Sequence, residues 1–486
     1  MTELLGLTHE PVDDIPLLMG LQQRLHLAEL LDQCLGTHWL HQGLSNGTLG
    51  TTWMAYILSE GDHRKSSVED WTERHRVTLE HLVGQPIRPV EFDDDRLGIV
   101  LHRLGTTPRW GELEEALWAK TVAVYEFETA GVRLDSTTSY GYHTPSEDGL
   151  MQLGHSKDHR PDPSLRSGQA LAQLKLMAGA IESAGHLVAC DVLPGQCADD
   201  PFYLPLIARI RQTLGRSGLL YTGDCKMAAL STRADIVAHG DYYLTPLPLT
   251  GDTRAEFEAW VGAAVEQGDL DSLELIWDGE RLLGAGCEFE RKLQAEVDGK
   301  TVDWTERVLV TRSRDLARQQ AAQLEERLTM AEAALRALTP EPGRGKRQYR
   351  EEGAFQTAIA EVVAGYRVDR LVNVAWEREE QQVTRYVGRE PALSAAKGRG
   401  GPQRPQRTEL KVRYVVTDVA RDAEAIAKQR HRLGWRVLIT NMAAERLTLT
   451  QAVIHYRGGW CLERDFHLIK DRPLGISPLY VRKSLP

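Results

Sequence analysis

Three polar residues near the C-terminus are spaced so that their side chains can act together. Glu463 lies seven residues after Tyr456 and seven residues before Lys470. Seven residues of α-helix complete two turns to within about 20°, so one helix here would place the phenol, the carboxylate and the ammonium on one face. Such a face suits a helix that holds a metal ion and lies against a phosphate backbone. Another face of the same helix carries apolar residues that can pack on a core: Leu462, Phe466 and Ile469.

Two carboxylates further upstream stand where strands could present them to the same site. Asp135 lies among small polar residues in the β-rich run 132–138, and Asp224 ends the short apolar run 218–224. A single Asp after a strand is usually a turn former or a helix cap, and a single Glu on a helix is usually solvated. The three acids together, combined with the Tyr/Lys spacing, favour a site that binds hard divalent cations through oxygen ligands.

These motifs resemble the DDE transposases of bacterial insertion sequences, in the group marked by a Tyr-x2-Arg-x3-Glu-x6-Lys signature. The signature falls on Tyr456, Gly459, Glu463 and Lys470, so glycine stands at its Arg position. Four further stretches are similar to this group: 135–138, 154–162, 173–177 and 222–224. The resemblance runs from about residue 1 to the C-terminus. Two other departures are an apparent insertion at 164–172 and an end at Pro486, before the helical tail that the group leads us to expect.

The order of the predicted elements favours an α/β fold, an RNase H-like mixed sheet flanked by helices. Strands and helices are predicted at the following ranges: strands 132–139, 173–181 and 186–194, helix 201–214, strand 219–224, helix 227–238 and strand 242–249. Three strands, helix, strand, helix, strand is the order of an RNase H-like core. The core then lacks its last helix until about 447–471. Asp135 and Asp224 are 89 residues apart, whereas Asp224 and Glu463 are 239 apart, so a large α+β insertion interrupts the core.

Four regions are expected along the chain. Residues 1–125 read as a helical N-terminal domain that could recognise a DNA end, or could equally be a plain helical bundle or a dimer contact. The others are the first part of the catalytic core at 126–249, an insertion domain with a long helix and strands at 250–446, and a last core helix with the third acid and a truncated tail at 447–486. Within the insertion, apolar residues from Leu324 to Leu338 step by four and three, which predicts one long amphipathic helix. Strands are predicted there at 413–417 and 435–440.

Composition excludes several classes of protein. The 486 residues contain no run of 18 or more apolar residues and no basic segment followed by an apolar stretch at the N-terminus, so we expect a cytoplasmic protein without a membrane span. The six cysteines form no C-x-x-C pair, which suits neither a zinc site nor a disulfide framework. The net charge of −11 is not an objection to DNA binding, because phosphate contacts depend on local basic patches. Such patches are present at 343–350, 397–413 and 457–483.

The resemblance implies an enzyme that cleaves DNA at the ends of a mobile element and joins them to a target. Two Mg²⁺ or Mn²⁺ ions would be held by Asp135, Asp224 and Glu463, with Asp135 bridging them, and no protein nucleophile would be needed. The residues expected to contact DNA are Tyr456, Lys470, Arg464, Lys157 and Arg160. The expected partners are double-stranded DNA, as terminal inverted repeats and as target, and a second copy of the chain in a homodimer on DNA.

Two other functions remain open from the sequence. The glycine at the signature's Arg position and the early end of the chain suit a catalytically impaired remnant that acts only as a DNA-binding protein. A nuclease with the same RNase H-like core, cutting without strand transfer, is the other alternative. The retained acids disfavour the first, and the long insertion together with the Tyr/Lys helix disfavours the second.

Overall fold

The computed structural model divides the chain into two compact units. It describes residues 9–36, 40–157, 171–266, 273–386, 406–471 and 474–479. The first unit comprises Met1–Phe257, Glu288–Leu309 and Val437–Pro486, and the second comprises Glu258–Cys287 and Val310–Arg436. In the described part of the chain, no helix is long and apolar enough to cross a bilayer.

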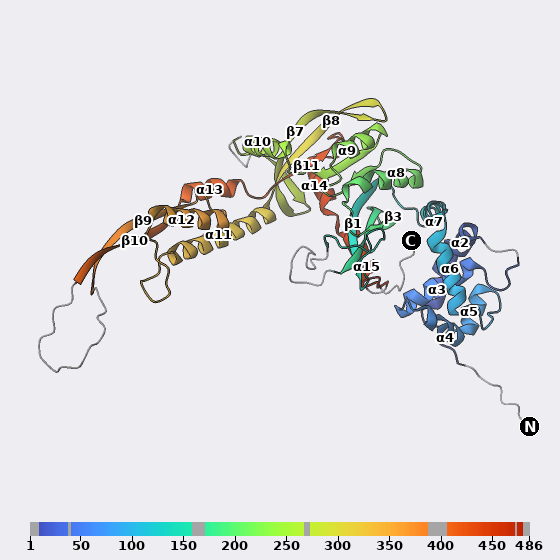
Figure 1. Cartoon of the computed structure of the whole chain (residues 1–486). Helices are drawn as coiled ribbons and strands as arrows, with labels where there is room; N and C mark the ends of the chain where they lie inside the picture. The colour runs from blue at the N-terminus through green and yellow to red at the C-terminus, as the bar shows by residue number, and fades with distance from the viewer. Residues whose placement is uncertain are drawn as a thin grey trace, which may run out of the picture. The chain divides into compact units, whose positions relative to one another are not determined.

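The first unit begins with helices, as the sequence predicted for residues up to about 125 (Figure 1). These are α1 (Ile15–Arg24), α2 (Leu27–Leu35), α3 (Asn46–Glu60), η1 (Lys65–Ser67), α4 (Val68–Arg74), α5 (Arg76–Val83), α6 (Asp94–Thr106) and α7 (Trp110–Tyr125). Their core is built around Trp71, which is completely buried and meets the ring of Tyr56 edge-on, with centroids 5.4 Å apart. The side chain of Ser45 caps α3 by accepting a hydrogen bond from the backbone N–H of Thr48, which fixes where this helix starts.

A mixed sheet with helices follows, and its first elements occur along the chain in the order that the sequence predicted. Its first elements are β1 (Gly131–Gly141), β2 (Ala172–Ile181), β3 (His186–Pro194), α8 (Tyr203–Leu214), β4 (Leu220–Thr222), α9 (Leu230–Ala238) and β5 (Tyr242–Pro246). β1, β2 and β3 pair antiparallel, whereas β4 runs parallel to both β1 and β5. The mixed α/β fold predicted from the sequence is confirmed.

The sheet continues beyond β5 to nine strands in the described chain, in the order β3-β2-β1-β4-β5-β11-β8-β7-β6. The added strands are β6 (Glu274–Asp278), β7 (Arg281–Val297), β8 (Lys300–Ser313) and β11 (Trp435–Thr440). β11 coincides with the strand predicted at 435–440 and pairs antiparallel with β5. β6, β7 and β8 were not predicted.

The last core helix is two helices, so the prediction of one continuous helix is wrong. α14 (Leu449–Arg457) ends before Gly458, and α15 (Trp460–Lys470) begins after Gly459. Glycine disfavours helix propagation by roughly 1 kcal/mol relative to alanine, and two in succession favour a break. Tyr456 is therefore on a different helix from Glu463 and Lys470.

The apolar face of α15 packs as predicted. Leu462 and Phe466 are buried against Ala178 and Ala180 of β2, and Ile469 is partly buried beside them. The small alanine side chains let the helix approach the sheet closely, and this packing leaves the Glu463 edge of the helix exposed.

The second unit contains the predicted long helix and a two-stranded ribbon (Figure 1). Its main elements are α10 (Asp252–Glu266), most of which belongs here, α11 (Arg314–Ala337), α12 (Glu352–Tyr366), β9 (Val372–Tyr386), β10 (Gln406–Arg421) and α13 (Ala423–His431). Leu324, Leu328 and Leu335 of α11 are buried in this unit's core, which confirms the stepped pattern. β9 and β10 pair antiparallel over their whole length, well beyond the strand predicted at 413–417.

Candidate active site

A cavity of about 720 Å³ in the first unit brings together two of the three acids singled out in the sequence. Its lining residues are Asp135, Ser136, Thr137, Tyr140, Lys157, Glu463, Phe466, His467, Lys470, Asp471 and Ser477. Asp135 and Glu463 are 328 residues apart in the sequence. The fold therefore places two of the three predicted acids, with Lys470 and Lys157, around one solvent-filled space.

Asp135 lies near the middle of β1 and is partly buried. Burial raises the pKa of its carboxyl, the ammonium of Lys157 opposes that rise, and the negative charge of Asp224 adds to it. Its Oδ1 accepts a hydrogen bond of 2.7 Å from the backbone N–H of Ser136 and lies 3.6 Å from Lys157 Nζ.

Asp224 follows β4, the strand next to β1. Arg133 of β1 is in register with Thr222, the last residue of β4. Asp135 and Asp224 each lie two residues further along the chain. Parallel strands lie about 4.8 Å apart and side chains alternate with a period of two, so this register brings the two carboxylates to neighbouring positions. The effect of Asp224 on the pKa of Asp135 agrees with that placement.

The carboxylate of Asp224 is oriented by its surroundings. The hydroxyl of Tyr203 donates to Oδ1 at 2.7 Å, and the backbone N–H of Lys226 donates to the same atom at 3.0 Å. Thr245 of β5 donates to the Asp224 carbonyl at 2.7 Å. Burial, followed by the charge of Asp224, raises the pKa of Tyr203, which stays a neutral donor. Asp224 is not among the described residues that line the cavity.

The donor set fits Mg²⁺ or Mn²⁺ in its chemistry. Asp135, Asp224 and Glu463 offer oxygen atoms only, and such ions accept one or two carboxylates and retain several waters. Within the described ranges, no group of three Asp, Glu, His or Cys side chains is close enough to hold one ion together. Shared coordination by all three acids remains a prediction.

The residues expected to contact DNA are distributed over several places. Lys470 lines the cavity with Glu463, whereas Arg464, one residue after Glu463, lines a second cavity of about 360 Å³ beside the exposed ring of Trp460. Tyr456 is on α14, and it is not one of the described residues that line either of these two cavities. Arg160 lies outside the described residues.

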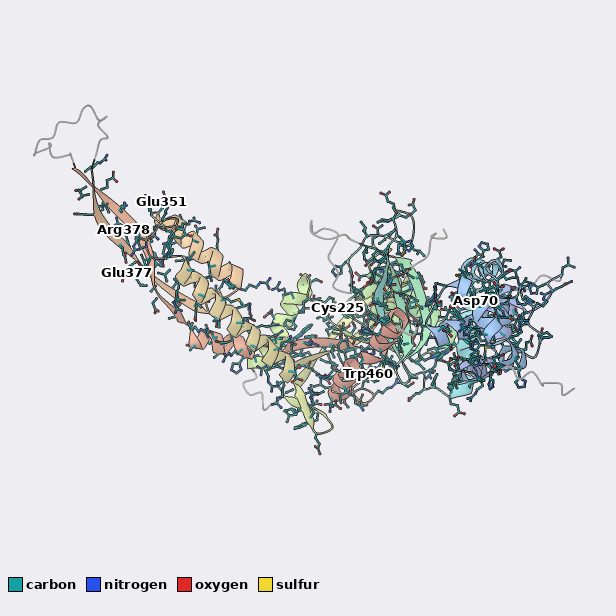
Figure 2. The ribbon with its side chains drawn as sticks, turned by 90° about the horizontal axis from the view of Figure 1, so that it is seen from below. Asp70, Cys225, Glu351, Glu377, Arg378 and Trp460 are labelled. Carbon is teal, nitrogen blue, oxygen red and sulfur yellow. The ribbon has the colours of Figure 1, made fainter. Side chains whose placement is uncertain are left out.

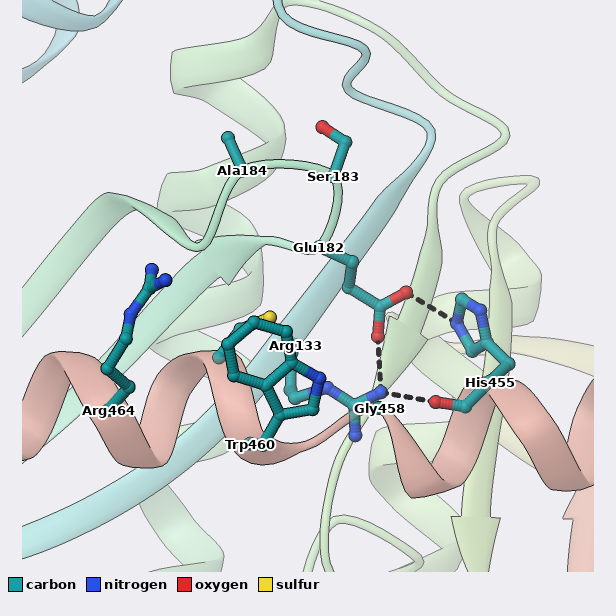
Figure 3. A pocket seen from close by; sticks show the side chains of 9 residues that line it. Arg133, Glu182, Ser183, Ala184, His455, Gly458, Trp460 and Arg464 are labelled. Atoms are coloured by element: carbon teal, nitrogen blue, oxygen red, sulfur yellow. Dashed lines mark hydrogen bonds and ion pairs between the residues drawn. The ribbon is translucent and has the colours of Figure 1, made fainter.

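A polar cluster that the sequence did not reveal joins the break between α14 and α15 to the sheet (Figure 3). Arg133 of β1 donates to the backbone carbonyls of His455, at 2.6 Å, and Tyr456, at 3.2 Å. Arg133 Nη2 also lies 2.8 Å from Glu182 Oε1, and the other oxygen of Glu182 lies 2.6 Å from His455 Nε2. Arg133 thus donates to two carbonyls at the C-terminal end of α14, where the helical hydrogen-bond pattern ends.

Arg133 also lies next to Gly459, the glycine at the Arg position of the Tyr-x2-Arg-x3-Glu-x6-Lys signature. A Cβ built on Gly459 would lie 3.4 Å from Arg133 Nη1. The guanidinium of Arg133 on β1 therefore lies beside position 459, and no local sequence pattern reveals this.

A second cluster missed by the sequence analysis surrounds Asp199, whose side chain is completely buried. Lys175 of β2 forms a short contact with Asp199 Oδ1, and Lys226 Nζ lies 2.6 Å from Oδ2. Lys157 is the third cation, 3.3 Å from Oδ2. The signal available in the sequence was Lys175, a charged residue within an otherwise apolar strand.

The comparisons with known proteins give only distant structural likenesses. No protein-family model and no curated protein matches the sequence. The chain is similar to the piggyBac transposase of a synaptic complex with hairpin DNA, at a TM-score of 0.28 and 10% identity, covering 65% of this chain and 60% of that one.

Two Mos1 structures are also similar. The Mos1 strand transfer complex matches at a TM-score of 0.16 and 13% identity, covering 48% of this chain and 66% of that one. The Mos1 transposase paired-end complex with the left transposon end matches at a TM-score of 0.17 and 10% identity, covering 48% of this chain and 78% of that one. The chain spans less than two thirds of the length of the first two structures. These TM-scores are too low to bear on function, so the proposal below is made from this chain's own residues.

Proposed function

We propose that this chain is the transposase of an insertion sequence, which cleaves DNA at the element's ends and transfers the cut strands by a two-metal DDE mechanism. The observation that carries the proposal is the meeting of Asp135 and Glu463 at one cavity, across 328 residues of sequence, with Asp224 two residues after the neighbouring strand β4. Asp135 lies near the middle of β1, an inner strand of the sheet, and Glu463 reaches the same cavity from α15.

Each residue has a defined part in this proposal. Asp135, Asp224 and Glu463 hold two divalent ions, which when bound neutralise charge on the attacking and leaving oxygens of a phosphodiester. Tyr203 holds the Asp224 carboxylate in one orientation through its 2.7 Å hydrogen bond. Lys470, on the same wall of the cavity as Glu463, pairs with a phosphate of the DNA end.

The remaining expected DNA contacts belong to the proposal as a wider surface. Arg464 lies beside the face of Trp460, with its guanidinium carbon 5.4 Å from the ring centroid, and faces the second cavity. Tyr456 and Arg160 are proposed as further backbone contacts. The helical region at 1–125 recognises the terminal inverted repeat, the region at 250–446 is the insertion domain, and two copies of the chain join two ends in a cytoplasmic, nucleoid-bound complex.

A cleavage assay tests the proposal. The substrate is a duplex carrying the inverted repeat that flanks the gene, incubated with Mg²⁺ and the full chain. Asp135→Asn, Asp224→Asn and Glu463→Gln should each reduce end cleavage by at least about a thousandfold, because they remove a metal ligand's charge and preserve its shape. Glu445→Gln, an exposed acid in the loop before α14, is the matched control and should cleave like wild type.

The same assay separates the alternatives. Cleavage that persists in EDTA, or in any of the three acid variants, contradicts the two-metal mechanism. Metal-dependent cutting without joined products would favour a nuclease, and specific binding without cutting would favour a remnant.

A further inference from the structure

The ammonium of Lys157 lies between the acid site and the buried Asp199. Its Nζ is 3.6 Å from Asp135 Oδ1 and 3.3 Å from Asp199 Oδ2. It also donates to the carbonyl of Ser136 at 2.8 Å and to the hydroxyl of the same residue. These four contacts hold a lysine charge inside the cavity wall, beside a proposed metal ligand.

Asp199 does not need Lys157 as its only counter-ion. Lys175 and Lys226 already contact one oxygen each of the Asp199 carboxylate. With two ammoniums on one carboxylate, the third positive charge is balanced by Asp135, the next nearest acid. The three lysines and the acids Asp199, Asp135 and Asp224 carry equal and opposite formal charges, so this part of the site is neutral without any metal ion.

We propose that Lys157 is a built-in counter-ion of Asp135 that competes with divalent metal and weakens its binding in the DNA-free protein. This inference rests on the proposed function, because it takes Asp135 to be a metal ligand. A divalent ion arriving at Asp135 meets an ammonium already held within 3.6 Å of the same oxygen. Two cations so close to one carboxylate repel each other, and the contacts to Ser136 and Asp199 prevent Lys157 from moving freely away.

The structure favours this role over a direct DNA contact by Lys157. A lysine that serves only phosphates would extend from the surface with its ammonium in water, whereas the side chain of Lys157 is only 28% exposed and its ammonium points to protein oxygens.

The test is a titration of the full chain with Mn²⁺ alone, followed by the loss of the free-ion electron paramagnetic resonance signal. Lys157→Met keeps the length of the side chain and removes its charge, and it should bind Mn²⁺ about tenfold more tightly than wild type, within the usual range of couplings between two sites. Lys157→Arg keeps the charge and should stay within about twofold of wild type.

Lys226→Met is the matched control, because Lys226 contacts Asp199 at 2.6 Å, whereas the ion pair to Asp135 comes from Lys157. Its gain in Mn²⁺ affinity should be clearly smaller than that of Lys157→Met. Far-ultraviolet circular dichroism checks that each variant is folded, and Lys157→Gln replaces Lys157→Met if the methionine variant is not.

Two results would overturn the inference: a neutral residue at 157 that leaves Mn²⁺ affinity unchanged or lower, or an equal gain in Lys226→Met. Asp135→Asn separates this failure from that of the proposed function. If wild type binds Mn²⁺ and Asp135→Asn does not, the metal site stands whatever the Lys157 variants do. If Asp135→Asn has no effect on Mn²⁺ binding, both proposals fail.

Discussion

The carboxylate of Asp199 is buried, and the positive charges of three lysines around it stabilise its ionised form. Burial opposes its ionisation, but hydrogen bonds from Lys175 and Lys226 prevail and hold its pKa well below the usual range. Asp199→Asn would leave two of these ammoniums, both close to the buried position, without their anion. Removing one partner of a buried ion pair typically costs about 3–5 kcal/mol, so we expect a loss of that size in the free energy of unfolding at pH 7. Urea unfolding followed by circular dichroism measures it.

The pH dependence of that loss has a definite sign. A carboxyl whose pKa is lower in the folded state stabilises the fold above its unfolded pKa of about 3.9, and this contribution disappears as the pH falls through the folded value. The difference between wild type and Asp199→Asn should therefore be constant from about pH 5 to 8 and should shrink below about pH 4. A difference that grows on acidification would contradict the ionised, lysine-paired state of Asp199.

At the scale of elements, Arg133 ties the end of α14 to β1. Its guanidinium binds two terminal carbonyls of the helix and the carboxylate of Glu182, and it is nearly buried. Arg133→Met should lower the free energy of unfolding by about 3 kcal/mol, because Glu182 loses its buried guanidinium partner and keeps only His455. Thermal unfolding reports the change. Arg457→Met, an exposed arginine at the end of the same helix, should change stability by no more than about 0.5 kcal/mol.

Substitutions at Gly459, in the break between α14 and α15, test whether Arg133 lies beside this position. Gly459 has φ −59°, which any residue can adopt, and its Cβ would make an ordinary contact of 3.4 Å with Arg133 Nη1. Gly459→Ala should therefore raise the free energy of unfolding by up to about 1 kcal/mol. Gly459→Arg restores the signature residue but brings a second guanidinium against Arg133, so it should be less stable than Gly459→Ala by about 1 kcal/mol. Equal melting temperatures for the two variants would mean that Arg133 does not occupy this space.

At the scale of the whole molecule, the net charge of −11 means that the proposed DNA binding would depend on a few local cations. Lys470 is such a cation, on the wall of the acid cavity. Lys470→Ala should weaken binding to a duplex carrying the element's end and lower the slope of log K against log salt by about 0.9, the value of one phosphate contact. Fluorescence anisotropy at several salt concentrations measures the slope. Glu463→Gln should leave it unchanged, since that carboxylate is proposed to serve a metal ion.

In the second unit, the hydrophobic pattern of the sequence predicts the long helix but not most of the two-stranded ribbon. The long helix α11 is evident because leucines recur on one face and are buried there. Much of the ribbon of β9 and β10 has no such pattern, since charged side chains such as Glu377 and Arg378 follow one another along it (Figure 2). Its strands are held by backbone pairing and by ion pairs such as Arg413–Glu379 at 2.6 Å. Partners of this kind cannot be identified until the chain is folded.

The sequence by itself determined the order of strands and helices in the core, and with it the positions of Asp135, Asp224 and Glu463. Those features are local: a buried strand is a short apolar run, and the core-facing side of α15 is three apolar residues at spacings of four and three. Only the tertiary structure decided which polar groups meet. Arg133 finds its carbonyl partners more than 320 residues away, and Lys157 finds Asp199 across two strands of the sheet. The break at Gly458 and Gly459 belongs to the same class. Two glycines lower the free-energy cost of a break in the helix. The hydrogen bonds of Arg133 to the carbonyls of His455 and Tyr456 then stabilise the end of α14 at this position.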